Sequence, residues 1–334
     1  MPHSVSVFGA AGFTGALTAR LLFSHPSFEL RALTARADAG KRLSELYPYH
    51  RVPIELEELD LDRHANVEAA VVAYPHGAAA ELVRDLRDRG VRVVDLSADF
   101  RLRDAAVYGE WYREHPTPEL ITEAVYGLPE RYREQIREAN LVANPGCFPT
   151  AALLALAPLA RAGLIDDVVI DAKSGVSGAG RAATERTHFV TVDENVNAYG
   201  VPHHRHTPEI EQELAVLGPP LQITFTPHLL PLDQGELLSC YVKLKDANAA
   251  NGHELARLYE DSYAEEPFVE LADSPPGVRD VRETNLCRLS AHADPRTGRV
   301  IVFAAIDNLW KGAASQAVQN LNLMFGLPES AGIA

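Results

Sequence analysis

The stretch "SVSVFGAAGFTGALTARLLFSHP", residues 4–26, decides the fold of this chain. Val5–Phe8 has the apolar character of a buried strand, and the residues from about Thr14 to Phe23 have the composition of a helix. A glycine-rich turn joins the two. A strand, a glycine turn and a helix in this order begin the βαβ unit of a dinucleotide-binding fold.

Three glycines stand at intervals of three residues in that turn, in a G-x-x-G-x-x-G pattern rather than the usual G-x-G-x-x-G. Gly9 permits the sharp turn, Gly12 lets a pyrophosphate approach the backbone, and Gly15 lets helix and strand pack closely. Tight packing with no ligand is the alternative. The strand and helix on either side favour nucleotide binding.

The next strand, "FELRALTAR" (residues 28–36), indicates which nucleotide. Glu29 has the spacing of a residue that binds an NAD ribose, but it falls at the beginning of the strand, away from the ligand end. Thr34 and Arg36 stand at the carboxyl end instead. A hydroxyl and a guanidinium suit a 2′-phosphate, so we expect NADP(H); a solvated surface arginine is the alternative.

Strands and helices continue to alternate through "VEAAVVAYPHG", "AAAELVRDLRDRG" and "VRVVDLSADFRL", which predicts an α/β fold with a doubly wound parallel sheet. Ligands bind beyond the carboxyl ends of such strands, where His76, Gly77, Ser97, Asp99 and Arg101 fall. An anionic substrate is expected to meet the arginine. A structural Asp99–Arg101 pair is the alternative.

A lone cysteine stands in "VANPGCFPTAALLALAPLARAG", residues 142–163. A short strand ends before an Asn-Pro-Gly turn, and Pro149 suits the first turn of a helix. Cys147 therefore lies at a helix N-terminus, where free N–H groups and the helix dipole favour a thiolate. A nucleophile is the functional interpretation and a small buried cap the structural one. Cys240 and Cys287 fall in apolar strands and are expected to be buried and inert.

A histidine-rich segment, "NAYGVPHHRHTPEIEQEL" (residues 197–214), offers proton partners for a thiol. We expect Thr207 to cap a helix, which places the histidines in the loop before it. His206 or His204 is the expected base and His203 a bystander. Neighbouring histidines cannot easily face one ion and Arg205 repels a cation, so no metal is expected.

Two further segments are candidates for lining the site. "DAKSGVSGAGRAATE" (residues 171–185) follows a strand, and its serines and glycines can present backbone N–H groups to a ligand. "AIDNLWKGAASQAVQNLNLMFGL" (residues 305–327) indicates a strand, a polar turn at Asn308 and a helix. A plain packing helix is the alternative for the second segment.

Composition and charge exclude several classes of protein. The chain has 334 residues, 46% hydrophobic and 23% charged, which fits a globular protein of about two domains. A net charge of −15 without basic runs argues against nucleic acid as a partner. Three scattered cysteines fit a reducing compartment. Because no signal-peptide pattern or long apolar stretch occurs, we expect a soluble, cytoplasmic protein with no membrane partner.

Taken together, the motifs "GAAGFTG", "PHG", "SADFR", "NPGCFPTAALLAL", "SGVSGAGR", "HRHTPEI" and "AIDNLWKGAA" resemble, in order, those of the N-acetyl-gamma-glutamyl-phosphate reductases of arginine biosynthesis, relatives of the aspartate-semialdehyde dehydrogenases. The resemblance implies a Rossmann domain, residues 1–146 and 312–334. It also implies an α+β catalytic and oligomerisation domain of the glyceraldehyde-phosphate dehydrogenase type, residues 147–311, and a homodimer or homotetramer.

The resemblance also implies residue roles. Cys147 is the nucleophile, His206 the acid/base partner, and His204 a further active-site residue. The implied cofactor-binding residues are Gly9, Ala11, Gly12, Phe13, Thr14, Gly15, Thr34, Arg36, Pro75, Ser174, Ser177, Gly178 and Asn308. The implied substrate-binding residues are Ser97, Arg101, Asn144, Arg181, Tyr199 and Glu209. An extra histidine in "VPHHRH" departs from the family pattern.

The chemistry expected from these residues is reduction of a small acyl phosphate. A Cys147 thiolate can displace inorganic phosphate and form a thioester, whose reduction to the aldehyde needs a hydride from NADPH and a proton, expected from His206. Two alternatives stay open. One is a reductase whose aminoadipyl or glutamyl phosphate is carried on a protein, and the other is an NADP-sensing regulator without turnover.

Overall fold

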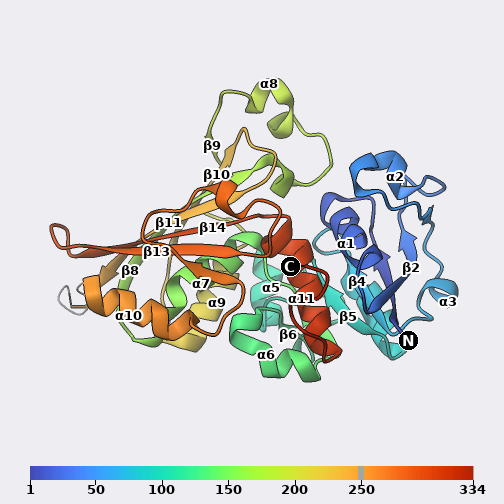
Figure 1. The fold of residues 1–334 in the computed structure, drawn as a ribbon, viewed down its shortest axis with the longest axis horizontal. Coiled ribbons are helices and arrows are strands. Elements are labelled where there is room, and N and C mark those ends of the chain that lie inside the picture. Colours follow the sequence, from blue (N-terminus) through green and yellow to red (C-terminus); the bar gives the residue numbers. More distant parts are fainter. Residues whose placement is uncertain (247–251, 334) are drawn as a thin grey trace. The chain divides into compact units, whose positions relative to one another are not determined.

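The computed structural model describes residues 1–246 and 252–333. The chain forms two compact units (Figure 1). The first unit comprises Met1–Gly146 and Ala313–Ala334, and the second comprises Cys147–Gly312. The C-terminal segment therefore returns to the unit in which the chain began. Among the described residues, no helix combines the length and apolar character needed to cross a membrane.

The first unit is built on a parallel sheet of seven strands in the order β3-β2-β1-β4-β5-β7-β6. The strands are β1 (His3–Phe8), β2 (Phe28–Thr34), β3 (Leu56–Glu57), β4 (Ala69–Val72), β5 (Arg92–Asp95), β6 (Val125–Tyr126) and β7 (Leu141–Ala143). Strand order runs outward from β1 in both directions, which creates the switch point where ligands bind in doubly wound folds. The predicted α/β fold class is confirmed.

Helices connect these strands and cover the sheet. They are α1 (Phe13–Phe23), α2 (Leu43–Leu46), α3 (Leu61–His64), α4 (Ala80–Asp88), α5 (Ala105–Trp111), α6 (Pro129–Glu138) and the C-terminal α11 (Ser315–Met324). The last helix packs against α1 and α6 (Figure 1). Every residue of α11 is buried, which explains its run of uncharged polar and apolar side chains.

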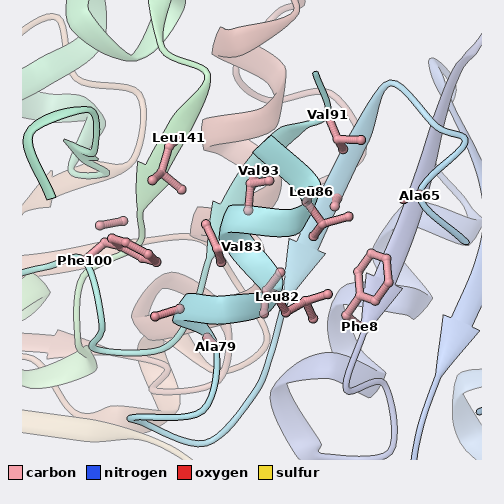
Figure 2. Packing of buried hydrophobic residues seen from close by; sticks show 14 of the residues in the cluster. Phe8, Ala65, Ala79, Leu82, Val83, Leu86, Val91, Val93, Phe100 and Leu141 are labelled. Atoms are coloured by element: carbon pink, nitrogen blue, oxygen red, sulfur yellow. The ribbon is translucent and has the colours of Figure 1, made fainter. Parts of the chain in front are cut away.

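The core beside α4 shows why this part of the sequence folds as βαβ (Figure 2). Val83 and Leu86 lie one helical turn apart on α4, and both are fully buried. They pack with Phe8 of β1, Val93 of β5 and Leu141 of β7 in one cluster. The apolar stripe of the helix thus covers strands from both sides of the switch point and fixes the carboxyl ends of β1 and β4.

The second unit is built on a mixed sheet in the order β12-β13-β14-β11-β8-β10-β9. The strands are β8 (Ile165–Gly175), β9 (Asn197–Ala198), β10 (Thr224–Leu230), β11 (Glu236–Leu244), β12 (Val269–Leu271), β13 (Cys287–Asp294) and β14 (Arg299–Ile306). Its helices are α7 (Cys147–Arg161), α8 (Phe189–Val192), α9 (Thr207–Leu217) and α10 (Gly252–Tyr263). A π-helical turn, Trp310–Ala314, leads into α11.

One face of this sheet is buried and the other is partly exposed. Leu238, Cys240 and Val242 alternate along β11 on the buried face, which α7 covers (Figure 1). Tyr259 on α10 donates a hydrogen bond to Ala155 O at 2.5 Å and so ties α10 to α7. The face of β11 that carries Tyr241 is partly exposed. Burial of Cys240 and Cys287 agrees with their predicted structural role.

Two helix starts differ slightly from the predictions. The first helix begins at Phe13, one residue before Thr14. The predicted capping role of Thr207 is wrong, because His206 is the N-cap residue and Thr207 is the first residue of α9. The Thr207 hydroxyl oxygen accepts no hydrogen bond from the described residues. Pro208 suits the second position as well as the first, so it could not fix the boundary to one residue.

Candidate active site

Cys147 begins α7, as the sequence predicted. The preceding turn is held by the backbone, since the Asn144 N–H donates to Asp95 O at 2.8 Å and Arg101 Nε donates to Asn144 O at 2.8 Å. Pro149 falls in the first turn of the helix, where it removes no helical hydrogen bond. Cys147 is partly exposed, unlike the two buried cysteines. A thiol at this helix end can meet a substrate.

The π-helical turn packs closely against Cys147. A Cβ built on Gly312 would lie 2.8 Å from Cys147 Cβ and 3.3 Å from Cys147 Cα. The turn itself is capped by Asp307, whose carboxylate accepts hydrogen bonds from the N–H groups of Glu283, Leu309 and Trp310 at 2.8–3.3 Å. Burial raises the pKa of Asp307 despite these bonds. Glycine at 312 leaves the space that Cys147 occupies.

The histidine loop packs on the first turn of α7. The rings of His204 and His206 each lie 5.8 Å from the ring of Phe148, the neighbour of Cys147 in the chain. His204 also contacts the rings of Tyr199 and Phe225 at 5.4 and 5.2 Å. Ring contacts in this aromatic cluster thus place both histidines beside the first turn of α7.

The two histidines have different environments. His204 Nδ1 accepts a hydrogen bond from the His206 N–H at 3.1 Å, which places the proton of the neutral ring on Nε2. Burial, with a smaller contribution from the charge of Arg205, lowers the pKa of His204 to about 4. His204 is therefore neutral near pH 7 and serves as a donor rather than as a proton acceptor.

Tyr199 adds a second donor. Burial raises the pKa of its phenol above the ordinary value, and the neighbouring Cys147 and Glu236 raise it further. The phenol stays protonated throughout the neutral range. Because the charge of Cys147 influences Tyr199, the two side chains lie near each other in the second unit. A protonated phenol in this place can donate to an oxygen that develops negative charge near the sulfur.

The glycine turn of the first unit has the conformation that a dinucleotide needs. Gly9 has φ +86°, and a Cβ there would lie 2.6 Å from Ala73 O. A Cβ at Gly15 would lie 2.4 Å from Gly9 O, so helix and strand could not approach as they do. Gly12 precedes α1 and no side chain of the described residues caps the helix. Its first N–H groups and dipole form a cradle that fits a pyrophosphate.

Two family models match the chain: "Semialdehyde dehydrogenase, NAD binding domain" over residues 4–139 and "Semialdehyde dehydrogenase, dimerisation domain" over residues 147–308. The N-acetyl-gamma-glutamyl-phosphate reductase of Desulforudis audaxviator is 51% identical, with 98% of this chain and 97% of that protein covered. The reductase of the same name from Rubrobacter xylanophilus is 49% identical, with 100% and 99% covered. The chain belongs to the N-acetyl-gamma-glutamyl-phosphate reductase family.

Solved structures support the fold of this family member. Aspartate semialdehyde dehydrogenase II from Vibrio cholerae matches with a TM-score of 0.74 at 21% identity, over 98% of this chain and 99% of that chain. The aspartate semialdehyde dehydrogenase of Candida albicans, solved with NADP, matches with a TM-score of 0.73 at 14% identity, over 97% and 99%. The family resemblance and the fold predicted from the motifs are confirmed.

At the end of β2 the reductase presents one of its two predicted phosphate-binding residues to solvent. Arg36 is exposed just beyond the strand. Thr34 is buried, and its hydroxyl accepts a hydrogen bond from the Gly9 N–H at 3.4 Å, so it supports the glycine turn. Glu29 pairs with Arg31 at 2.7 Å near the start of β2. Among the other predicted cofactor residues, Ala11 O accepts a hydrogen bond from Tyr47 at 2.8 Å, and Pro75 is exposed after β4.

Several predicted substrate residues of the first unit form a buried hydrogen-bond network. Ser97 Oγ donates to Asp95 Oδ2 at 2.6 Å, and burial raises the pKa of Asp95 to about 7. Arg101 donates to the carbonyls of Asn144 and Leu96. Asp99 accepts hydrogen bonds from the two backbone N–H groups at the start of α4. These bonds shape the turn before Cys147.

Asn308 joins three segments of the second unit. Its Nδ2 donates to Ser177 Oγ at 3.0 Å, and its Oδ1 accepts from the Gly235 N–H at 2.7 Å. A Cβ on Gly178 would lie 3.1 Å from Ser174 Oγ. The segment of Ser174, Ser177 and Gly178 is thereby fixed to the start of β11. Arg181 follows on the exposed side, and Glu209 is buried in the first turn of α9.

Sequence reasoning missed one ionisable residue of this site. Glu236 begins β11, is fully buried, and interacts with the Cys147 thiol. The signal was present, because "ELLSCYVKL" puts a glutamate in register with the inward-facing leucine, cysteine and valine. In the described part of the chain, no group of three His, Cys, Asp or Glu side chains could hold a metal ion.

Proposed function

We propose that this chain catalyses the NADPH-dependent reductive dephosphorylation of N-acetyl-L-glutamyl 5-phosphate to N-acetyl-L-glutamate 5-semialdehyde, a step of arginine biosynthesis. The observation that carries the proposal is identity of about half over nearly the whole length to reductases of that name. The partly exposed Cys147 at the start of α7 supplies the nucleophile that such a reaction needs.

The residues of the chain perform the covalent step. Cys147 Sγ attacks the acyl carbon, the bond from that carbon to the phosphate oxygen breaks, and inorganic phosphate leaves behind a thioester on sulfur. The bound cofactor supplies the hydride for reduction. His206 donates the proton that the carbonyl oxygen requires, and the Tyr199 phenol donates a hydrogen bond to the same oxygen. His204 orients His206 through the bond to its backbone N–H.

The first unit holds the NADP(H). The turn from Gly9 to Gly15 and the uncapped start of α1 bind the pyrophosphate, and Arg36 binds the 2′-phosphate. We assign the cofactor domain to residues 1–146 and 313–334 and the catalytic domain to residues 147–312, the two units of the fold, which moves the boundary expected from the motifs by one residue. Support comes from the positive φ of Gly9 and from the exposed position of Arg36 beyond β2.

The substrate is the acetylated amino acid rather than a free one. Arg205 carries positive charge in the loop between His204 and His206, which attracts the carboxylate and phosphate of the substrate and repels a free α-ammonium. The resemblance to the family also implies substrate contacts for Ser97, Arg101, Asn144, Tyr199 and Glu209, and we include these residues in the proposed substrate site.

The test is turnover of purified protein with N-acetylglutamate semialdehyde, NADP⁺ and phosphate, followed by the absorbance of NADPH. We expect oxidation at least about a hundredfold more efficient than that of aspartate semialdehyde, a gap of about 2.7 kcal/mol in transition-state binding. Cys147→Ser should abolish turnover and retain cofactor binding. Comparable kcat/KM for the two aldehydes would overturn the substrate assignment, and an active Cys147→Ser variant would overturn the nucleophile.

We also propose that the protein is a homodimer or homotetramer of this fold. The second unit matches a dimerisation domain, and the outer face of its sheet carries partly exposed Tyr241, Ile301 and Phe303. A second copy of the chain would cover these apolar side chains. Light scattering coupled to gel filtration tests the proposal: a dimer or tetramer that Phe303→Glu dissociates supports it, and a monomeric wild type contradicts it.

A further inference from the structure

Glu236 occupies a place in the sheet where the pattern of the fold calls for an apolar side chain. It pairs with Ser174 of β8 and Ile306 of β14, and its side chain lies on the same face as Leu238 and Cys240. That face is the one covered by α7, and Glu236 is 0% exposed. A carboxyl group therefore lies in the core of the second unit, at the end of the sheet where α7 begins.

The carboxyl has no structural partner that explains its presence. Within residues 1–246 and 252–333, no group donates a hydrogen bond of ordinary geometry to Oε1 or Oε2. Asp307, one residue beyond the β14 partner of Glu236, differs in this respect because three backbone N–H groups satisfy its carboxylate. Burying a polar group without partners costs free energy, so a purely structural role would favour an apolar residue here.

The side chain that Glu236 does influence is the nucleophile. The pKa of Glu236 is raised to about 8, chiefly because the side chain is buried; interaction with the Cys147 thiol opposes this rise, and the charge of Asp307 adds to it. Tyr199 faces the same pair, since both Cys147 and Glu236 raise the pKa of its phenol. The carboxyl can consequently gain and lose its proton near neutral pH, and it interacts with the thiol.

We propose that Glu236 holds the proton of Cys147 during catalysis, a role that deepens the proposed function and rests on it. The carboxylate takes the proton from the thiol as sulfur attacks the acyl phosphate, so that the S–H bond breaks, an O–H bond forms, and both electrons of the S–H bond remain on sulfur for the new S–C bond. When the thiohemiacetal collapses, His206 takes back the hydroxyl proton and the C=O bond of the aldehyde forms. The electrons of the S–C bond return to sulfur, and the carboxylic acid gives its proton to that sulfur.

This division gives the two proton sites different tasks. Glu236 serves the sulfur, and His206 serves the oxygen of the substrate. Two acidic groups in contact cannot readily both be ionised, so once the pair has lost one proton, the thiol and the carboxyl share the proton that remains. The pair then carries one negative charge, either on sulfur or on the carboxylate.

The first test measures alkylation of Cys147 by iodoacetamide between pH 5.5 and 9.5, with the modified residue identified by mass spectrometry. In the wild type we expect two ionisation steps, which belong to the coupled pair. Glu236→Gln should give a single step. The matched control is Glu213→Gln, a buried glutamate of α9 that accepts a hydrogen bond from Gln212 at 3.0 Å and whose substitution should leave two steps. Superimposable profiles for wild type and Glu236→Gln would overturn the proposal.

The second test separates a proton carrier from a space-filling residue. Glu236→Gln should lower kcat about a hundredfold and leave KM within about threefold, while its melting temperature stays at or above that of the wild type. Glu236→Asp should recover part of kcat, and Glu236→Leu should recover none. Full activity of the leucine variant would show that the carboxyl has no chemical role.

The two proposals can fail separately. Alkylation requires no substrate, so different profiles with no turnover of N-acetylglutamate semialdehyde would sustain the role of Glu236 toward the thiol and refute the proposed function. Turnover with identical profiles would do the reverse.

Discussion

Replacing Gly312 by alanine tests whether the position of the nucleophile is set by the close approach of the π-helical turn. The added Cβ would lie 2.8 Å from Cys147 Cβ, whereas ordinary contacts begin at 3.4 Å, so the two groups must separate by about 0.6 Å. Asp307 O, at 3.3 Å from the same Cβ, and Cys147 Cα leave little room on the other sides. Relief therefore requires a shift of the turn, of the first turn of α7, or of both.

The expected effects follow from that shift. Overpacking of this kind costs about 1–3 kcal/mol of stability. A displacement of about 1 Å in a reacting group lowers the rate by roughly a hundredfold, so a shift of about half that size should lower kcat on the order of tenfold. Binding of NADPH should change little, because the nearest atoms to the added Cβ belong to Cys147 and Asp307, neither of which is assigned to the cofactor.

The assay compares kcat, the melting temperature and the rate of Cys147 alkylation in Gly312→Ala and in a control. Gly109→Ala is the control, since a Cβ on Gly109 in α5 meets no atom within 4 Å and its φ is not positive. That variant should gain about 0.5–1 kcal/mol and keep its kcat. A Gly312→Ala enzyme with lower stability but wild-type kcat and alkylation would refute the dependence of the thiol on this turn.

Three further predictions concern the cofactor and pH. Arg36→Ala should weaken binding of NADPH much more than that of NADH in titration calorimetry, and equal losses would remove Arg36 from the phosphate site. Because burial lowers the folded pKa of His204 to about 4, the free energy of unfolding measured with urea should fall by at most about 3 kcal/mol as the pH is lowered from 6.5 to 4. His204→Asn should reduce that fall. Because the folded pKa of Glu236 is raised to about 8, the free energy of unfolding of the wild type should fall by at most about 5 kcal/mol between pH 4.5 and 8. Glu236→Gln should lack that fall. A difference in stability between the two proteins that stays constant over this pH range would contradict the prediction.

Features of the fold that depend only on residues close together in the sequence could be predicted from local patterns. The glycine spacing around Gly9 predicted the turn because a positive φ and a close approach to Ala73 exclude a side chain there. The Pro-Gly turn and Pro149 predicted the helix start at Cys147, because a proline in the first turn removes no helical hydrogen bond. Thr207 shows the limit, since its hydroxyl suits a cap but His206 occupies that position. The choice between adjacent residues depends on the loop that packs on Phe148.

Contacts between distant segments could not be predicted. Asn144 Nδ2 donates to Ala313 O at 3.3 Å, and its Oδ1 accepts from Asn320 at 3.0 Å, so a residue expected to bind substrate also anchors the C-terminal helix. Asn308 likewise joins Ser177 to Gly235. Such partners meet only through the tertiary fold, and each residue's type is compatible with either role.

Glu236 shows what a sequence pattern can contribute once the register of the sheet is known. A helix N-terminus explains how Cys147 can be ionised, but it offers no atom that receives the thiol proton, because its N–H groups are donors. Asp307 is a buried acid at the same end of the sheet, and backbone N–H groups satisfy its carboxylate. Glu236 has no such bonds and is held in the core at a cost in stability. A fold that keeps an unsatisfied carboxyl beside its nucleophile gains proton transfer from it, which is why stability and turnover should respond in opposite directions when that carboxyl becomes an amide.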